Sequence, residues 1–263
     1  MADRRTILAM GGGGFTMEPG NPALDDLVLD LTGRREPRIL FLPTASGDPA
    51  RQIGAFHERF GDRACVPRDL SLFRLADETE SLEDVILRQD AIYVGGGSMR
   101  NLLAIWKAHG LDELLVTAWE RGTVLAGLSA GAMCWMQGGV TRSGGAAAPI
   151  AGLGLLPGSL TVHADGEPER LPVWLAAVKA GDLPGGWAAD DGVGLVFDGL
   201  RLDRVVTSRP GTTALRVDCV GGELVRDRLT PELLASAPAA PQVRASDTEA
   251  IRELRQVREL RRR

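Results

Sequence analysis

The sequence predicts an α/β fold with a mostly parallel sheet flanked by helices. Over the first two thirds of the chain, short apolar runs alternate with longer segments of helical periodicity. These runs are apolar throughout, as strands covered on both faces by helices are. In the last third, short strand-like runs follow one another and predict antiparallel strands added to the edge of the same sheet. Without a linker or repeat, residues 1–245 are expected to form a single domain.

Hydrophobic spacing and stop signals place the individual elements. Leu24, Leu27, Val28 and Leu31 recur at helical spacing, and Ser81 is followed three residues later by Asp84, which is typical of a capped helix start. Glycines at 33, 61 and 110 end three of the helices. The expected strands are 6–10, 38–43, 90–94, 123–126, 159–162, 193–197, 204–207 and 214–217, and the expected helices are 24–31, 49–60, 81–88, 99–108, 111–121 and 130–136.

The composition is that of an ordinary globular protein. The 263 residues are 44% hydrophobic and 25% charged, which excludes disorder over the whole length. The net charge of −5 argues against nucleic acid as the principal partner. The three cysteines, Cys65, Cys134 and Cys219, form neither a CxxC pair nor a metal-ligand spacing. Their usage favours a reducing, cytoplasmic compartment.

One long stretch of low charge does not predict a membrane span. Residues 122–164 contain Arg142 as their only formally charged side chain. A span needs about 20 predominantly apolar residues, whereas glycines and prolines repeatedly interrupt this stretch. The apolar run at 7–10 is also too short for the core of a signal peptide. We therefore expect no membrane association.

The segment 246–263 differs in character from the rest. Ser246 and Glu249 form a capping box, and a narrow apolar stripe runs from position 251 to position 260. Six arginines lie within this segment. It is expected to be a basic, solvated helix with cations at its negative end. A docking helix that makes a homodimer is the alternative.

The strongest chemical signal is GLSAG at 127–131. It follows an expected strand and precedes a helical run, which is the context of a nucleophile elbow. Such a turn strains Ser129 and pushes its Oγ clear of the sheet, and small neighbours avoid Cβ clashes. The N–H of Ala130 then points to where an oxyanion would form. Ser129 is the predicted nucleophile, and a glycine-rich turn with an incidental serine is the alternative.

A nucleophilic serine needs a base, and the chain has three histidines. His57 lies within an expected helix and His109 at a helix end. His163 follows the strand 159–162, and strand-end loops are where catalytic groups collect in α/β folds. His163 is therefore the predicted base, with a hydrogen-bonded loop histidine as the alternative.

Two further glycine-rich segments lie at strand ends. In the segment 93–98, the lack of Cβ atoms at Gly96 and Gly97 lets backbone amides approach a substrate carbonyl. The Gly97 amide is the predicted second oxyanion donor beside Ala130, with a plain turn as the alternative. The segment 11–14 lacks both GxGxxG spacing and a Walker lysine. It is interpreted as a close-packed turn bordering the site, and no metal or cofactor is expected.

Five strings occur in a characteristic order over about residues 5–215. They are FLPTAS at 41–46, YVGGGS at 93–98, GLSAGA at 127–132, GLGLLP at 152–157 leading to His163, and ADDG at 189–192. In these strings the sequence resembles the peptidase E family of serine peptidases, which includes aspartyl dipeptidase and cyanophycinase. The resemblance implies a fold like that of class I glutamine amidotransferases, with no metal. It also implies Ser129 as nucleophile, His163 as base, and Gly97 with Ala130 as oxyanion hole.

The resemblance implies a carboxylate as the third member of the site. The family's acid is most often a glutamate in a short loop before a late strand, and Asp190 and Asp191 occupy that loop here. Aspartate is one methylene shorter, so the loop must lie closer to His163. Asp191 is the preferred acid and Asp190 the second choice, and a simple turn is the alternative. Some relatives carry an aspartate after the nucleophile helix, where this chain has Arg142 but no acid.

A preference for an N-terminal aspartate in the substrate would require a cation. Arg170 lies seven residues after His163, at a position that resembles a family arginine, and Arg142 is a second candidate. Either can instead be a surface arginine. Arg170 can also pair with Glu167 or Glu169 and brace its loop.

The sequence thus predicts a cytoplasmic serine peptidase that acts on short peptides without a cofactor. An aspartyl dipeptidase is the narrower form of this expectation. One alternative is an amidohydrolase or acyl-transfer enzyme that uses the same triad on a non-peptide amide. A non-catalytic binding protein of the same fold is another.

Overall fold

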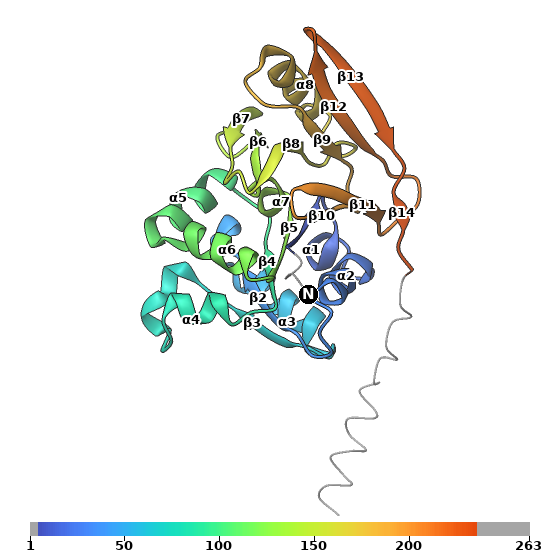
Figure 1. The fold of residues 1–263 in the computed structure, drawn as a ribbon. Helices are drawn as coiled ribbons and strands as arrows, with labels where there is room; N and C mark the ends of the chain where they lie inside the picture. The colour runs from blue at the N-terminus through green and yellow to red at the C-terminus, as the bar shows by residue number, and fades with distance from the viewer. Residues whose placement is uncertain (1–4, 236–263) are drawn as a thin grey trace, which may run out of the picture.

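The computed structural model describes residues 5–235, which form two β-sheets with helices packed against them (Figure 1). The strands are β1 (Thr6–Met10), β2 (Arg38–Leu42), β3 (Val66–Asp69), β4 (Ala91–Val94), β5 (Val124–Leu128), β6 (Met136–Thr141), β7 (Ala148–Ala151), β8 (Leu156–Thr161), β9 (Gly186–Ala189), β10 (Val193–Asp198), β11 (Arg201–Thr207), β12 (Ala214–Val220), β13 (Glu223–Leu229) and β14 (Glu232–Leu233). The helices are α1 (Gly14–Met17), α2 (Ala23–Leu31), α3 (Ala50–Gly61), α4 (Leu82–Leu87), α5 (Met99–His109), α6 (Leu111–Glu120), α7 (Ala130–Met133) and α8 (Arg170–Ala180), with short 3₁₀ helices η1 (Thr44–Ser46) and η2 (Leu72–Asp77).

The first sheet has eight strands in the order β14-β11-β10-β1-β5-β4-β2-β3. The five strands from β1 to β3 in this order run parallel, whereas β10 pairs antiparallel with β1 and β11 antiparallel with β10. Parallel strands end at the same edge of a sheet. The segments that follow β1, β4 and β5 therefore meet there, and these are the three glycine-rich strings of the sequence.

Helices cover both faces of this sheet, so its central strands β1, β5, β4 and β2 are buried on both sides. In β1, Ile7 and Ala9 pack into one apolar cluster, whereas Leu8 and Met10 pack into another. The first cluster includes side chains of α4, α5 and α6, and the second includes side chains of α1, α2 and α3. This two-sided burial explains why the strands are apolar throughout rather than alternating.

The second sheet has six strands in the order β13-β12-β9-β8-β6-β7 and lies at the top of the view in Figure 1. Its central strands β6, β8 and β9 are parallel. Helix α8 packs on it through Trp174 and Val178, which are buried against Val140 and Ala188. His163 follows β8, and the Asp190–Asp191 pair follows β9. The second sheet therefore carries the predicted base and acid, and the first carries the predicted nucleophile.

The predicted α/β class, its parallel sheet and its flanking helices are confirmed, and three details are corrected. The late strands do not all extend the first sheet, because β12 pairs with β9 and β13 in the second. The helix after Ser129 ends at Met133, because residues from Met136 onward pair with β8 as strand β6. Helix α8 has no counterpart among the predicted elements. The predicted basic helix at 246–263 lies outside the described residues.

A buried carboxylate lies beneath the first glycine-rich loop. The Asp25 side chain is fully buried, and it lies 3.2 Å from Arg59 Nε. Its Oδ1 accepts hydrogen bonds from the Phe15 amide at 3.2 Å and the Tyr93 hydroxyl at 3.3 Å. Burial raises the pKa of Asp25 to about 7, although the Arg59 charge and these hydrogen bonds oppose the rise.

This raised pKa predicts how the stability depends on pH. Between the ordinary value of 3.8 and about 7, the folded protein holds a proton at Asp25 that the unfolded chain has released. The contribution of Asp25 is therefore fully present below about pH 4 and is lost as the pH rises through about 7. Asp25→Asn removes this dependence. Its free energy of unfolding, measured in urea, should rise relative to the native protein between pH 5 and pH 8, by about 3 kcal/mol.

The control for this prediction is Asp26→Asn, the same change one residue away. It leaves Asp25 in place and removes only the smallest contribution to its raised pKa, so most of the native pH dependence should remain. If the free energies of unfolding of the native protein and of Asp25→Asn differ by a constant amount from pH 5 to pH 8, Asp25 is not the source of the pH dependence.

Candidate active site

Ser129 occupies a strained turn between β5 and α7. Its φ of 54° and ψ of −114° place a non-glycine residue at positive φ. The turn fits because its neighbours lack side chains. A Cβ at Gly127 would overlap the carbonyl oxygen of Gly131, and a Cβ at Gly131 would overlap that of Val94. Both glycines of GLSAG are therefore required by close backbone approach.

His163 reaches Ser129 from the second sheet. Its Nε2 lies 2.9 Å from Ser129 Oγ, a hydrogen-bond distance. His163 also has a positive φ, of 55°. A tight turn holds this backbone, because the amides of Gly166 and Glu167 both donate to the His163 carbonyl, at 3.1 and 2.8 Å.

Of the two candidate acids, Asp191 faces the imidazole. Its Oδ1 is hydrogen-bonded to His163 Nδ1. The Asp190 carboxylate points elsewhere and accepts the Thr213 amide at 2.8 Å. Burial raises the pKa of Asp190, and the Thr213 hydrogen bond opposes the rise. The structure thus joins Ser129, His163 and Asp191 into one hydrogen-bonded chain and gives Asp190 a separate contact within the fold.

The predicted oxyanion donors lie beside Ser129. A Cβ placed at Gly96 would be 3.3 Å from the Ser129 Cβ, so the β4 loop packs directly on the nucleophile turn. Gly97 has a φ of 142°, and a Cβ there would overlap the Ala45 carbonyl oxygen. Ala130 is the first residue of α7, where N–H groups have no partner within the helix. Within residues 5–235, the amides of Gly97 and Ala130 donate no hydrogen bond, so both can serve a ligand.

The glycine-rich loop after β1 packs against the acid and the base. A Cβ at Gly12 would overlap Asp191 Oδ1 and would lie 3.0 Å from His163 Nδ1. The Gly12 carbonyl accepts a hydrogen bond from the Gly192 amide at 3.2 Å. The Gly11 amide donates one to the Val193 carbonyl at 2.8 Å. The loop is therefore the close-packed turn that the sequence predicts.

The two arginines predicted to bind substrate are already paired within the protein. The Arg170 side chain is 9% exposed and lies 2.7 Å from Glu167, and it donates to the Val140 carbonyl at 2.8 Å. Arg142 lies 2.6 Å from Glu169 and 3.3 Å from Glu167. Although burial alone would raise the pKa of Glu167, hydrogen bonds and charge from Arg170 and Arg142 lower it. Arg170 thus makes the kind of contact predicted for its alternative role, in which it pairs with a nearby glutamate and braces its loop.

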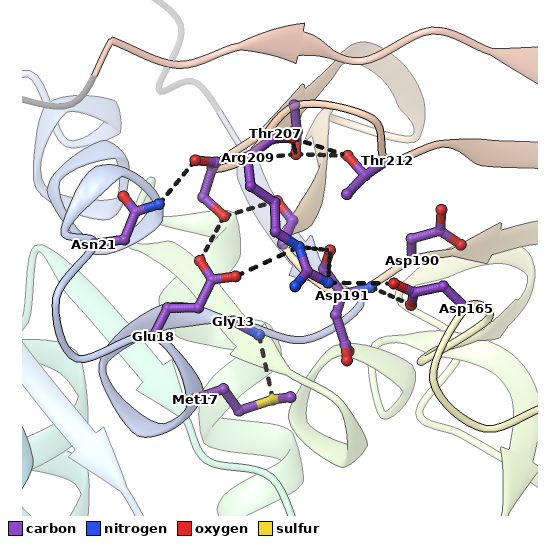
Figure 2. A network of polar contacts seen from close by, with 12 residues as sticks. Gly13, Met17, Glu18, Asn21, Asp165, Asp190, Asp191, Thr207, Arg209 and Thr212 are labelled. Carbon is purple, nitrogen blue, oxygen red and sulfur yellow. Dashed lines mark hydrogen bonds and ion pairs between the residues drawn. The ribbon is translucent and has the colours of Figure 1, made fainter.

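Sequence reasoning did not find a charged network around Asp191 (Figure 2). Arg209, in the loop after β11, donates to the Asp191 carbonyl through Nε at 3.0 Å and Nη2 at 2.8 Å. Asp165 accepts the Asp191 amide at 2.9 Å. Arg209 belongs to no recognisable motif. Asp165 could have been noticed because it lies two residues after His163.

A cavity of about 620 Å³ lies beside the β4 loop, between α1, η1 and α3. Its lining includes Ser46 and Gln52. The Ser46 amide would be 2.9 Å from a Cβ at Gly97, and Gln52 Oε1 would be 3.5 Å from one at Gly95. The cavity wall is thus in contact with the glycine segment that adjoins Ser129.

The described part of the chain has neither a cluster of metal-binding side chains nor a membrane-spanning helix. Over residues 5–235, no three His, Cys, Asp or Glu side chains cluster in a way that could hold a metal ion. In the same range, no helix is both long enough and apolar enough to cross a membrane.

The chain is similar to known peptidases. The model of "Peptidase family S51" matches residues 7–205. The "Uncharacterized peptidase YgaJ" of Bacillus subtilis (strain 168) is 47% identical over 213 residues, which are 81% of this chain and 92% of that protein.

Two solved structures are also similar. The crystal structure of a peptidase from an acI-B1 Actinobacterium aligns with a TM-score of 0.66 and 18% identity, over 90% of this chain and 99% of that one. A putative peptidase E protein from Listeria monocytogenes EGD-e aligns with a TM-score of 0.49 and 17% identity, over 86% of this chain and 100% of that one.

The fold and the relatives together define the class of protein. The chain is a serine-type peptidase with a fold like that of the class I glutamine amidotransferases. It belongs to peptidase family S51.

The bracing contacts of Arg170 lead to a prediction that differs from a substrate-binding role. Arg170→Ala should lower the free energy of unfolding by about 1–3 kcal/mol, because it removes a buried guanidinium together with the hydrogen bond that the buried Val140 carbonyl accepts. It should also reduce kcat/KM for the dipeptides Asp-Leu and Ala-Leu by the same factor. Thermal unfolding and dipeptide assays measure both effects.

Arg142→Ala is the matched control for Arg170→Ala. It removes an exposed partner of the same Glu167, so it should change stability by less than about 1 kcal/mol. A selective loss of Asp-Leu cleavage in Arg170→Ala, with an unchanged Tm, would instead restore Arg170 as a substrate-binding residue.

Proposed function

We propose that the protein hydrolyses short peptides through an acyl-enzyme formed on Ser129. One observation carries the proposal: the hydrogen-bonded chain Ser129–His163–Asp191 begins at a strained serine. A serine, a base and a group that orients the base are the parts that nucleophilic catalysis by serine needs. The strand–turn–helix setting of Ser129 supports its role as a nucleophile elbow.

The first half of the reaction forms the acyl-enzyme. Ser129 Oγ attacks the scissile carbonyl carbon while His163 Nε2 takes the hydroxyl proton. The carbonyl oxygen becomes an oxyanion, and the amides of Gly97 and Ala130 donate to it. When the C–N bond breaks, the leaving amine takes the proton from His163, and the acyl group remains esterified to Ser129.

The second half repeats these transfers with water. His163 takes a proton from water as its oxygen attacks the ester carbon, and the same two amides hold the new oxyanion. The C–O bond to Ser129 then breaks, and His163 returns the proton to Ser129 Oγ. The products are an amine and a carboxylic acid. Asp191 keeps the imidazole in the tautomer with a proton on Nδ1 and stabilises its charged form without taking the proton itself.

The surroundings of the site have room for a short peptide. The cavity beside the β4 loop offers about 620 Å³, room for a few residues. Its wall combines apolar side chains such as Phe15 and Pro49 with the polar side chains of Ser46 and Gln52. Both arginines that were predicted to bind an aspartyl side chain are engaged with glutamates, whereas the cavity is lined by a different cation, Arg51. We therefore propose a small-peptide hydrolase in which neither Arg170 nor Arg142 selects an N-terminal aspartate.

Removing the nucleophile or the base should abolish turnover. Ser129→Ala and His163→Ala should each lower kcat by on the order of 10⁵–10⁶, and the double variant by no more, because the two groups act as a unit. Asp191→Asn should cost less, about 10⁴-fold, because it misorients a base that remains present. A fluorophosphonate should modify Ser129, as peptide mapping by mass spectrometry can show.

His57→Ala is the control for these variants. His57 also pairs with an aspartate, Asp69 at 2.8 Å, but it lies on α3. This variant should keep native activity. Undiminished peptidase activity in Ser129→Ala, or labelling of another serine, would overturn the mechanism.

The role of the cavity can be tested by filling it. Gly54 lines the cavity, and a Cβ there would meet nothing within 4 Å. Gly54→Leu therefore adds a side chain to the cavity wall without a clash, and leucine favours the helix more than glycine does. We expect a several-fold higher KM for short peptides, and an unchanged rate of Ser129 labelling by a small fluorophosphonate.

Gly61→Leu is the matched control for the cavity. Gly61 belongs to the same helix and has equally open space around its Cβ position, but it is not among the residues that line the cavity. Its KM should remain native. Equal KM values for the two variants would rule out the cavity as the peptide-binding site.

A further inference from the structure

The main chain of Asp191 is held on both sides by charged side chains outside the triad (Figure 2). On one side, Asp165 Oδ1 accepts the Asp191 amide at 2.9 Å. On the other, Arg209 donates two hydrogen bonds to the Asp191 carbonyl, at 3.0 and 2.8 Å. Arg209 Nη2 also lies 3.2 Å from Asp165 Oδ2, which closes the contacts into a ring.

This ring joins the loop of the base to the loop of the acid. Asp165 lies two residues after His163, in the turn that the His163 carbonyl organises. The Ala164 amide adds a hydrogen bond to the Ala189 carbonyl at 3.2 Å. The two loops are therefore tied together at points other than the His163–Asp191 hydrogen bond itself.

Arg209 is itself held in place by a second set of contacts. The Thr207 hydroxyl accepts the Arg209 amide at 3.2 Å and donates to its carbonyl at 2.9 Å. Glu18, in the segment after α1, lies 3.6 Å from Arg209 Nε and accepts the Ser208 hydroxyl at 2.7 Å. Thr207 thus holds the main chain of Arg209, while Glu18 and Asp165 hold its guanidinium.

The short reach of aspartate explains why such contacts matter. Asp191 lies between β9 and β10, and one methylene connects its carboxylate to the main chain. A displacement of that main chain therefore moves the carboxylate almost as far. Because misplacing a group in the active site by about 1 Å can reduce turnover about 10²-fold, the position of this backbone matters for catalysis.

We propose that Arg209 and Asp165 form a positioning clamp that keeps the Asp191 carboxylate on His163 Nδ1. The inference rests on the proposed function and deepens it by adding two positioning residues to the triad. The competing role for Arg209 is recognition of a substrate carboxylate. The existing contacts favour the clamp, because Asp165, Glu18 and the Asp191 carbonyl already surround the guanidinium.

The test compares Arg209→Gln with the native protein. We expect kcat to fall about 10- to 100-fold with little change in KM, for Asp-Leu and Ala-Leu alike. The rate of Ser129 labelling by a fluorophosphonate should fall in the same proportion. The downfield proton resonance of the His163–Asp191 hydrogen bond, identified by its absence in His163→Ala, should weaken or shift. Arg209→Lys should recover part of kcat, because an ammonium keeps the charge but lacks the planar fork.

Arg68→Gln is the matched control. Arg68 also pairs with two carboxylates, Glu78 and Glu80, but it lies on β3 at the far edge of the first sheet. It should keep native kcat and native labelling. A double-mutant cycle of Arg209→Gln with Asp165→Ala should be non-additive in kcat, because both side chains hold the same peptide group.

Three outcomes would overturn the clamp. They are native kcat and labelling in Arg209→Gln, additive effects in the cycle, or a loss confined to Asp-Leu, which would assign Arg209 to substrate recognition. Failure of the proposed function is distinguishable from these, because the native protein would then show no labelling at Ser129. A Tm measurement on each variant ensures that only folded proteins are compared.

Discussion

The hydrogen bond between Ser129 Oγ and His163 Nε2 joins two sheets that carry different parts of the site. Ser129 follows β5 of the eight-stranded sheet, whereas His163 and Asp191 follow β8 and β9 of the six-stranded sheet. The contact forms only if the carboxyl ends of both sets of parallel strands face one another. The positive φ values of Ser129 and His163 lie at the two ends of this contact, where each backbone must turn its side chain toward the other.

Backbone packing at glycines makes this approach possible. Gly127 and Gly131 let the turn at Ser129 pack against neighbouring carbonyls, and Gly12 leaves room for the Asp191 carboxylate beside the imidazole. At each of these positions a methyl group would overlap an atom of the site or of its support. The high glycine content of the strand ends is therefore a consequence of close packing around three side chains. It does not require a bound phosphate.

The sequence predicted those parts of the fold and site that depend on local signals. Two-sided apolar runs predicted the parallel strands, and the Ser81 cap and the glycine at 110 predicted helix limits that the structure matches within a residue or two. The second sheet was not predicted, because β6 and β7 are rich in small residues, and because β8, β9 and β12 pair across the intervening helix α8 and strands β10 and β11. The pairing of Arg170 with Glu167, three residues away, was one of the alternatives that the sequence offered. By contrast, nothing local shows that Arg209 reaches Asp191 from a distant loop.

The most direct measurement of the central claim is a pre-steady-state experiment with a chromogenic ester or amide of a small amino acid. The proposed mechanism predicts a burst of about one product per chain, followed by slower turnover. Quenching in acid during the burst should trap the acyl group, and mass spectrometry should place it on the peptide that contains Ser129. Turnover without any trapped adduct, or an adduct on another residue, would contradict the acyl-enzyme mechanism and the role of the Ser129–His163–Asp191 chain.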